Sequence, residues 1–214
     1  MTTSYGPTAR TTPTRYRERA RYDSETVHRI LDEALICHLG YIRDGEPVVL
    51  PTTHTRRGET LYIHGSTGSG PMLAARVAEL PLCITVTLVD GLVLARSAMH
   101  HSLNYRSVMV LGTARVVEDP DEKLLALHAL LDHIQAGRAA DCRGPNPREL
   151  AATTVLALDL AEASAKVRSG GPVDDPQDHA LPHWAGVVPL ALRAGTPEPA
   201  ADLDPATPLP AYLR

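Results

Sequence analysis

The sequence predicts a mainly β fold of the α+β class, an antiparallel barrel of six strands with two to three peripheral helices. Three observations favour it. Segments with period-two patterning follow one another through short turns, as hairpins do. Helical patterns are too few and too unevenly spaced to alternate with strands as in a parallel sheet. The chain has no Phe and only 4% aromatic residues, so aliphatic side chains must fill its core.

Three segments carry helix signals. They cover residues 22–35, 71–79 and 119–134. Asp23 or Ser24 can cap the first, whose apolar residues recur at helical spacing. Pro71 suits the first position of the second helix. Asp119 begins the third, and Glu122 stands where a capping box needs an acid. We expect each helix to pack one apolar face on the barrel.

Seven segments separated by turn residues carry the strand patterns from which we expect the six or so strands of the barrel. They cover residues 36–42, 47–54, 61–64, 82–89, 92–97, 105–118 and 153–160. Asp44-Gly45 is a dipeptide that supplies the positive φ angles of a type I′ hairpin. A second turn lies at 56–59, and Asp90-Gly91 predicts a third. Gly112, inside the longest strand, suggests a bulge.

Composition restricts the partners. The net charge of −4 gives no long-range attraction for nucleic acid, so a small molecule is the favoured partner. The three cysteines include no C-x-x-C pair, which argues against a disulfide framework. No apolar run approaches the ~18 residues that span a bilayer, and no leader is apparent. We expect a cytoplasmic protein that binds neither membrane nor nucleic acid.

The chain divides into three parts by composition. Residues 1–21 are rich in Thr, Pro and Arg and predict a flexible N-terminal arm. Residues 22–170 hold all the strand and helix patterns and form one domain. Residues 171–214 are rich in Pro, Asp and Ala, so we expect an extension that packs on the barrel or on a partner subunit.

The segment from His64 to Pro71 connects a strand to a helix through Gly, Ser and Thr. Backbone amides, hydroxyls and the positive end of a helix dipole converge in such a connection, which suits a phosphate. The loop lacks the G-K-[ST] ending of a P-loop. A flexible connector therefore stays an equal alternative.

The segment 100–108 is dense in hydrogen-bonding groups at the start of a long strand. Adjacent His100 and His101 would point to opposite faces of a strand, so no metal site is predicted there. Neither Ser66 nor Ser69 is framed as G-x-S-x-G, which argues against a hydrolase. Lys166 follows the last predicted strand and either reaches an anion at the barrel mouth or is a surface charge.

Together these segments resemble the pyridoxamine 5′-phosphate oxidase-like flavoproteins, particularly the branch related to nitroimidazole-resistance proteins. The resemblance covers about residues 15–190. It rests on the helix 22–35, Pro47–His54, Leu61–Ser66, Asn104–Val108, Gly112, Ala165–Arg168 and His183–Pro189. It implies a split β-barrel homodimer over residues 22–170, with FMN bound where two subunits meet.

The resemblance also implies the cofactor-binding residues. They are Leu50, Pro51, Thr52 and Thr53 along the flavin ring, His64, Gly65, Ser66 and Ser69 at the phosphate, and Tyr105, Arg106, Ser107, Lys166 and Trp184 around the groove. Relatives carry a cation shortly after the position of Ser69, where this chain has Gly70-Pro71. Arg76, Lys166 or an arm arginine is then expected to pair with the phosphate.

The leading functional hypothesis is an FMN-dependent oxidoreductase acting on a small molecule, in which the cofactor transfers the electrons. No catalytic base is assigned. A haem protein on the same barrel is the alternative, because neutral imidazoles are good axial ligands. The candidate haem ligands are His54, His64, His100 and His101. A deazaflavin (F420) enzyme and a non-catalytic flavin-binding module stay open.

Overall fold

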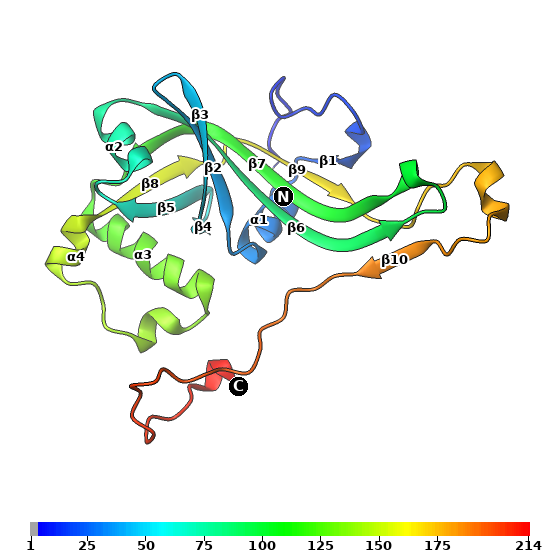
Figure 1. Cartoon of the computed structure of the whole chain (residues 1–214). Coiled ribbons are helices and arrows are strands. Elements are labelled where there is room, and N and C mark those ends of the chain that lie inside the picture. The colour runs from blue at the N-terminus through cyan, green and yellow to red at the C-terminus, as the bar shows by residue number, and fades with distance from the viewer. Residues whose placement is uncertain (1–3) are drawn as a thin grey trace.

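The ten strands of the protein pair only in antiparallel fashion in the computed structural model, which describes residues 4–214. The strands are β1 (Ala20–Arg21), β2 (Cys37–Arg43), β3 (Glu46–Thr52), β4 (His54–Arg57), β5 (Thr60–Ser66), β6 (Leu80–Leu94), β7 (Ser102–Val116), β8 (Thr153–Asp159), β9 (Glu162–Arg168) and β10 (Gly186–Pro189). The predicted split-barrel fold is confirmed (Figure 1).

The pairing order explains how the sheet curls into a barrel. Its main path runs β3-β2-β6-β7-β8-β5-β4, and β9 pairs with both β7 and β1. The two ends of the path, β3 and β4, are consecutive in the chain and separated only by Thr53. The β2–β3 hairpin turns at Asp44 and Gly45, whose φ angles of 54° and 84° confirm the predicted type I′ turn.

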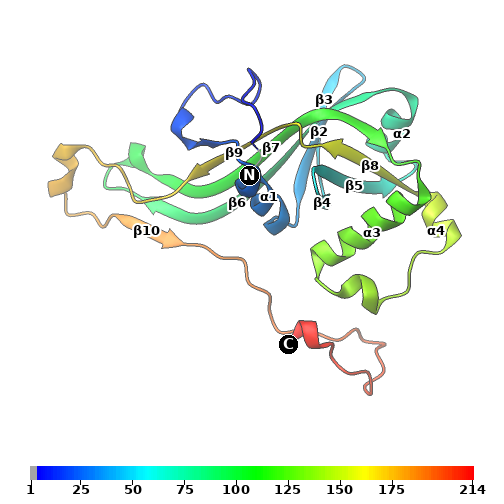
Figure 2. The same ribbon diagram turned by 180° about the vertical axis from the view of Figure 1, so that it is seen from behind.

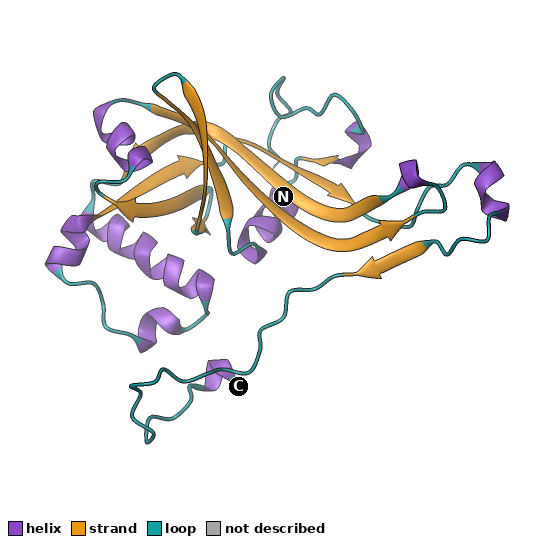
Figure 3. Ribbon diagram, in the orientation of Figure 1, coloured by secondary structure: helices purple, strands orange, loops and turns teal. Residues whose placement is uncertain are grey.

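Within residues 4–214, four α-helices lie outside the sheet (Figures 2 and 3). They are α1 (Ser24–Glu33), α2 (Gly70–Val77), α3 (Pro120–Ile134) and α4 (Pro147–Ala152), with short 3₁₀ turns at Arg17–Arg19, Ala98–His100, Arg138–Asp141, Pro176–Ala180 and Ala211–Leu213. Asp23 caps α1 by accepting the Thr26 amide at 2.8 Å. The capping box expected in α3 does not form, because Glu122 bonds Arg115 and Tyr62 instead.

Two apolar clusters hold the barrel. The larger fills its interior and includes Leu61 and Ile63 of β5. The smaller lies between the sheet and α3, and includes Tyr62 of β5 with Ala126 of α3. The alternation of side chains along a strand therefore places His64, like Tyr62, on the α3 side of β5.

The structure corrects two details of the strand prediction. The turn expected at Asp90-Gly91 is wrong: β6 runs through both residues, and only its register shifts between Val89 and Gly91. A Cβ on Gly91 would stand 3.1 Å from the backbone oxygen of Val188 in β10, so the glycine allows β10 to approach. Residues 162–168 form the strand β9, which the prediction missed.

The two terminal segments contact the barrel. Tyr5 of the predicted arm is buried, and its hydroxyl donates to Glu59 at 2.7 Å. In the C-terminal segment β10 pairs with β6, whereas most of the residues beyond it are exposed. Asp174 anchors the same segment by accepting from Arg96 at 2.8 Å. Within residues 4–214, no helix combines the length and apolarity that crossing a membrane would demand.

Candidate functional site

Two cavities lie on either side of β5, and they share His64. The first, here called the α2 cavity, has a volume of about 280 Å³. Its lining comes from β2, β3, β5 and the first turn of α2. The second, here called the α3 cavity, has a volume of about 370 Å³ and lies between β5 and α3.

The α2 cavity gathers six residues that the sequence had assigned to one cofactor site. They are Leu50, Pro51 and Thr52 of β3, His64 and Gly65 of β5, and Ser69 before α2. β3 supplies a largely apolar wall, and the helix start supplies amides and a hydroxyl at the opposite wall. The Ser69 Oγ is buried without a hydrogen-bond partner among the described residues. The cavity therefore suits a flat apolar group that carries an anionic end.

An arginine and a tyrosine that the sequence did not single out lie beside Gly70-Pro71. Arg43 and Tyr41, at the end of β2, line the α2 cavity beside Gly70. The cations expected there lie elsewhere. Arg76 lines a separate cavity, and Lys166 lines another that also holds Arg10 of the arm. No local signal identifies Arg43, because its proximity to Gly70 depends on non-local packing.

The α3 cavity has apolar walls and two imidazoles. Leu127, Leu130, Leu131 and Ile134 of α3 line it, together with His64, His128 and Arg143. The His64 Nδ1 is buried without a partner among the described residues. Burial also lowers the pKa of His64, so its ring is neutral at pH 7. A neutral imidazole with a free nitrogen beside an apolar cavity can ligate a metal in a macrocycle.

The structure does not bring the other predicted residues into either cavity. They are Thr53, Ser66, Tyr105, Arg106, Ser107, Lys166 and Trp184. Ser107 and Lys166 line a third cavity of about 230 Å³ beside the arm. Trp184 is 66% exposed and lies against Gly186. Their role in a groove shared with a second subunit stays a prediction.

Arg106 is held by carboxylates. It donates to Glu33 at 2.7 Å and to Asp90 at 2.7 Å, and both contacts are ion pairs. These bonds raise the pKa of Arg106 and lower that of Glu33. The guanidinium therefore joins α1 to β6, and its predicted role at the cofactor stays a prediction.

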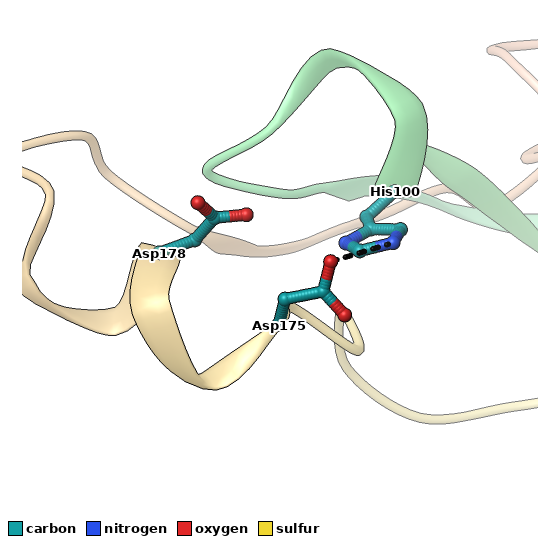
Figure 4. A group of neighbouring side chains, drawn as sticks. All are labelled: His100, Asp175 and Asp178. Atoms are coloured by element: carbon teal, nitrogen blue, oxygen red, sulfur yellow. Dashed lines mark ion pairs between the residues drawn. The ribbon is translucent and has the colours of Figure 1, made fainter.

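The remaining histidines differ in their surroundings. His54 is fully buried and donates from Nε2 to the Leu31 carbonyl at 2.9 Å, away from both cavities. His101 is exposed, and its Nδ1 lies 3.0 Å from the Ser97 carbonyl. His100 faces Asp175 and Asp178 of the C-terminal segment, with its Nε2 4.0 Å from an oxygen of Asp175 (Figure 4). The Nδ1 atoms of His54 and His100 are also buried without a partner among the described residues, but of the four candidates His64 alone lines the α2 or the α3 cavity.

Three comparisons with known proteins bear on the site. A family model described as pyridoxamine 5′-phosphate oxidase matches residues 23–167. The flavocytochrome Anf3 from Azotobacter vinelandii is 41% identical, with 98% of this chain and 97% of that chain covered and a TM-score of 0.90. The FAD and haem binding protein from Mycobacterium smegmatis is 40% identical over 91% of this chain and 95% of its own, with a TM-score of 0.85.

A more distant likeness concerns the branch that the sequence suggested. A candidate 5-nitroimidazole antibiotic resistance protein from Bacteroides thetaiotaomicron is 23% identical over 69% of this chain and 86% of its own, with a TM-score of 0.58. That similarity shows the fold alone. No curated protein matches the sequence. The match over residues 23–167 and the two relatives at about 40% identity show that the chain belongs to the pyridoxamine 5′-phosphate oxidase family.

Proposed function

We propose that this protein is an oxidoreductase that binds a flavin in the α2 cavity and a haem in the α3 cavity. The observation that carries the proposal is the position of His64, which lines both cavities and has a buried, unpartnered nitrogen. When bound, the flavin supplies hydride or electron transfer and the haem supplies one-electron chemistry. The protein's own contribution is to bind, orient and exclude water.

The α2 cavity supports a flavin because its two ends differ in chemistry. Leu50 and Pro51 offer an apolar wall for a ring system, and Ser69 and the α2 N-terminus face the other end. Of the flavins, we propose FAD ahead of FMN, because the similar protein from Mycobacterium smegmatis is described as binding FAD and haem. FMN and F420 are outcomes that the binding experiment separates.

The α3 cavity supports a haem because an imidazole, an apolar wall and a cation meet there. The ring of His64 is uncharged at pH 7 and lines this cavity, so the imidazole can serve as a ligand to iron. The α3 leucines would exclude water from the macrocycle. Arg143 lines the same cavity, and its guanidinium already pairs with Glu149 at 2.7 Å, so a carboxylate of the bound group would share this cation with Glu149.

A homodimer is part of the proposal. Two apolar side chains of β3 are exposed, Val49 at 63% and Leu50 at 39%, and they lie on opposite faces of the strand, with Leu50 on the side of the α2 cavity. Ile36, just before β2, is 47% exposed. A second copy packed on the Leu50 side of β3, beside the α2 cavity, would bury Leu50 and enclose the ring of a bound flavin. Light scattering on the purified protein tests this, and a monomer at micromolar concentration would contradict it.

The absorption spectrum of the purified protein tests the two cofactors together. We expect a flavin band and a Soret band in protein expressed with a haem precursor. His64→Ala should lose the Soret band and keep the flavin band, because the change removes the ligand from the α3 cavity. His101→Ala is the matched control, since His101 is exposed and lies outside both cavities.

Each result decides a separate part of the proposal. A Soret band that survives in His64→Ala would refute His64 as the ligand, and His128→Ala would then test the second imidazole of the α3 cavity. A protein that binds neither FAD, FMN nor F420 would refute the flavin site. Loaded protein that turns over no reductant would leave a non-catalytic binding module, contrary to the proposed oxidoreductase.

A further inference from the structure

We infer that Tyr41 and Arg43 form the anion-binding end of the α2 cavity, where they bind the phosphate or diphosphate of the cofactor in place of a loop cation. The inference deepens the proposed function and rests on it as far as the flavin is concerned. It adds two residues of β2 to the site, and neither belongs to the loop between β5 and α2.

Tyr41 is a buried polar side chain with an unused hydroxyl. The residue is only 5% exposed, and its hydroxyl makes no hydrogen bond to any described residue. A Cβ placed on Gly70 would stand 2.9 Å from this hydroxyl, so the oxygen lies at the start of α2. Because this hydroxyl has no hydrogen bond to a described residue and Tyr41 lines the α2 cavity, it is available to donate to a ligand oxygen.

Arg43 brings a positive charge to the same point. Its NH1 lies 3.5 Å from the Cβ position of Gly70. Its one ion pair within residues 4–214 is with Asp44, at 3.7 Å from its Nε, and the Asp44 side chain is 91% exposed. Such a surface pair holds an arginine weakly. The guanidinium fork is therefore available to an anion, which it can bind through two parallel bonds.

The N-terminus of α2 supplies further hydrogen-bonding groups at this end of the α2 cavity. Ser69 is the N-cap residue, yet its side chain makes no capping bond and its Oγ is buried without a partner. Pro71 has no N–H, so the free amides of the first turn come from Gly70 and Met72. These amides and the positive end of the helix dipole favour an anion. A tyrosine hydroxyl, a serine hydroxyl, a guanidinium and helix amides thus meet at one end of the cavity.

Gly70 explains why this end stays open. Its φ is not in the left-handed region, so the backbone here does not require glycine. What requires glycine is space, because a methyl group would occupy the corner between the Tyr41 hydroxyl and the guanidinium of Arg43. Gly70→Ala therefore separates binding from folding, since alanine is the better helix former.

The experiment measures the affinity of the full-length protein for FAD, FMN and riboflavin by flavin fluorescence, and for inorganic pyrophosphate by ³¹P line broadening. Arg43→Gln should weaken FAD, FMN and pyrophosphate by about 10- to 100-fold, the effect of losing a charged hydrogen-bond donor. Tyr41→Phe should weaken them by about 2- to 10-fold. Gly70→Ala should weaken them without lowering the melting temperature.

Riboflavin and a control variant make the test specific. Riboflavin has no phosphate, so its affinity should be the same in Arg43→Gln as in the unchanged protein. Arg193→Gln removes the same charge from an exposed position outside the cavity and should change nothing. Arg43→Lys keeps the charge without the fork and should recover part of the affinity for phosphate-bearing ligands.

The outcomes separate this inference from the proposed function. If Arg43→Gln binds FMN and pyrophosphate like the unchanged protein, or loses riboflavin to the same extent, the inference is refuted while flavin binding stands. If the unchanged protein binds pyrophosphate through Arg43 but binds no flavin, the anion site stands and the flavin proposal fails. If it binds neither probe, both are wrong.

Discussion

Acid should destabilise this protein through His54. The ring is fully buried, and its Nε2 donates to the Leu31 carbonyl at the C-terminal turn of α1. The pKa of His54 is lowered from 6.5 to about 4, chiefly by burial and in part by the His133 ring 5.0 Å away, while the hydrogen bond to the Leu31 carbonyl opposes the shift. The folded protein therefore keeps this ring neutral where the unfolded chain already binds a proton.

The direction and the size of this change in stability follow from the linkage between proton binding and folding. Below pH 6.5 the unfolded state binds more protons at this site, so stability falls as the pH drops from the unfolded pKa of 6.5 toward the folded pKa of about 4. A difference of roughly 2.5 pKa units, at about 1.4 kcal/mol each, amounts to about 3 kcal/mol. That is a large part of the stability of an ordinary domain.

The assay is urea unfolding of the native chain and of His54→Gln at a series of pH values between about 7.5 and 4. Glutamine can still donate to the Leu31 carbonyl but does not titrate. The native chain should lose about 3 kcal/mol more than the variant across this range, because the other titrating groups are common to both. Parallel pH profiles would refute the reasoning. An NMR titration of the His54 ring supplies a second readout, and a midpoint near the ordinary value would also refute it.

Three further substitutions test the fold. Asp23→Ala removes the cap of α1 and should lower the free energy of unfolding by about 1 kcal/mol in chemical denaturation; an unchanged midpoint would contradict the capping role. Gly112→Ala would place its Cβ 2.7 Å from Leu158, so we expect the free energy of unfolding to fall by about 1–3 kcal/mol. An unchanged free energy of unfolding would contradict this expectation. Arg106→Gln leaves Glu33 and Asp90 unpaired and should lower the melting temperature while flavin affinity stays unchanged; a large loss of affinity would instead support the predicted cofactor contact.

The sequence predicts those parts of the fold that depend on neighbouring residues. The hairpin at Asp44-Gly45 and the cap at Asp23 are local, and the structure confirms both. Asp90-Gly91 carries the same kind of turn signal and is wrong, because the pairing of β10 with β6 overrides it. The approach of β10 is set by residues about a hundred positions away in the chain, which no local pattern reveals.

The residues of the candidate site also include some that local sequence patterns predict and others that they do not. Leu50–Thr52 and His64–Ser69 each form a continuous segment, and the structure brings most of both into one cavity. Arg43 was missed because it reaches Gly70 only through the curl of the barrel. The carboxylate partners of Arg106 are 73 and 16 residues away, so no local pattern reveals these ion pairs, and its role at the cofactor stays a prediction. Sequence patterns identify the groups that a site requires, but non-local ion pairs decide which of them are free.

Strand β3 limits how a second copy can approach. It ends the pairing path, and it contains Pro47 and Pro51 opposite Ile42 and His38 of β2. Prolines in a sheet lie where no N–H is needed, so we infer that both nitrogens point away from β2. Along that outer edge only Val49 then retains an N–H, too few for another strand to add to the sheet. A second copy of the chain would therefore pack against the exposed side chains of β3 and would not add a strand to its edge. A ring bound beside Leu50 would then lie between the packed surfaces of two subunits, and the two sheets would not be joined by backbone hydrogen bonds.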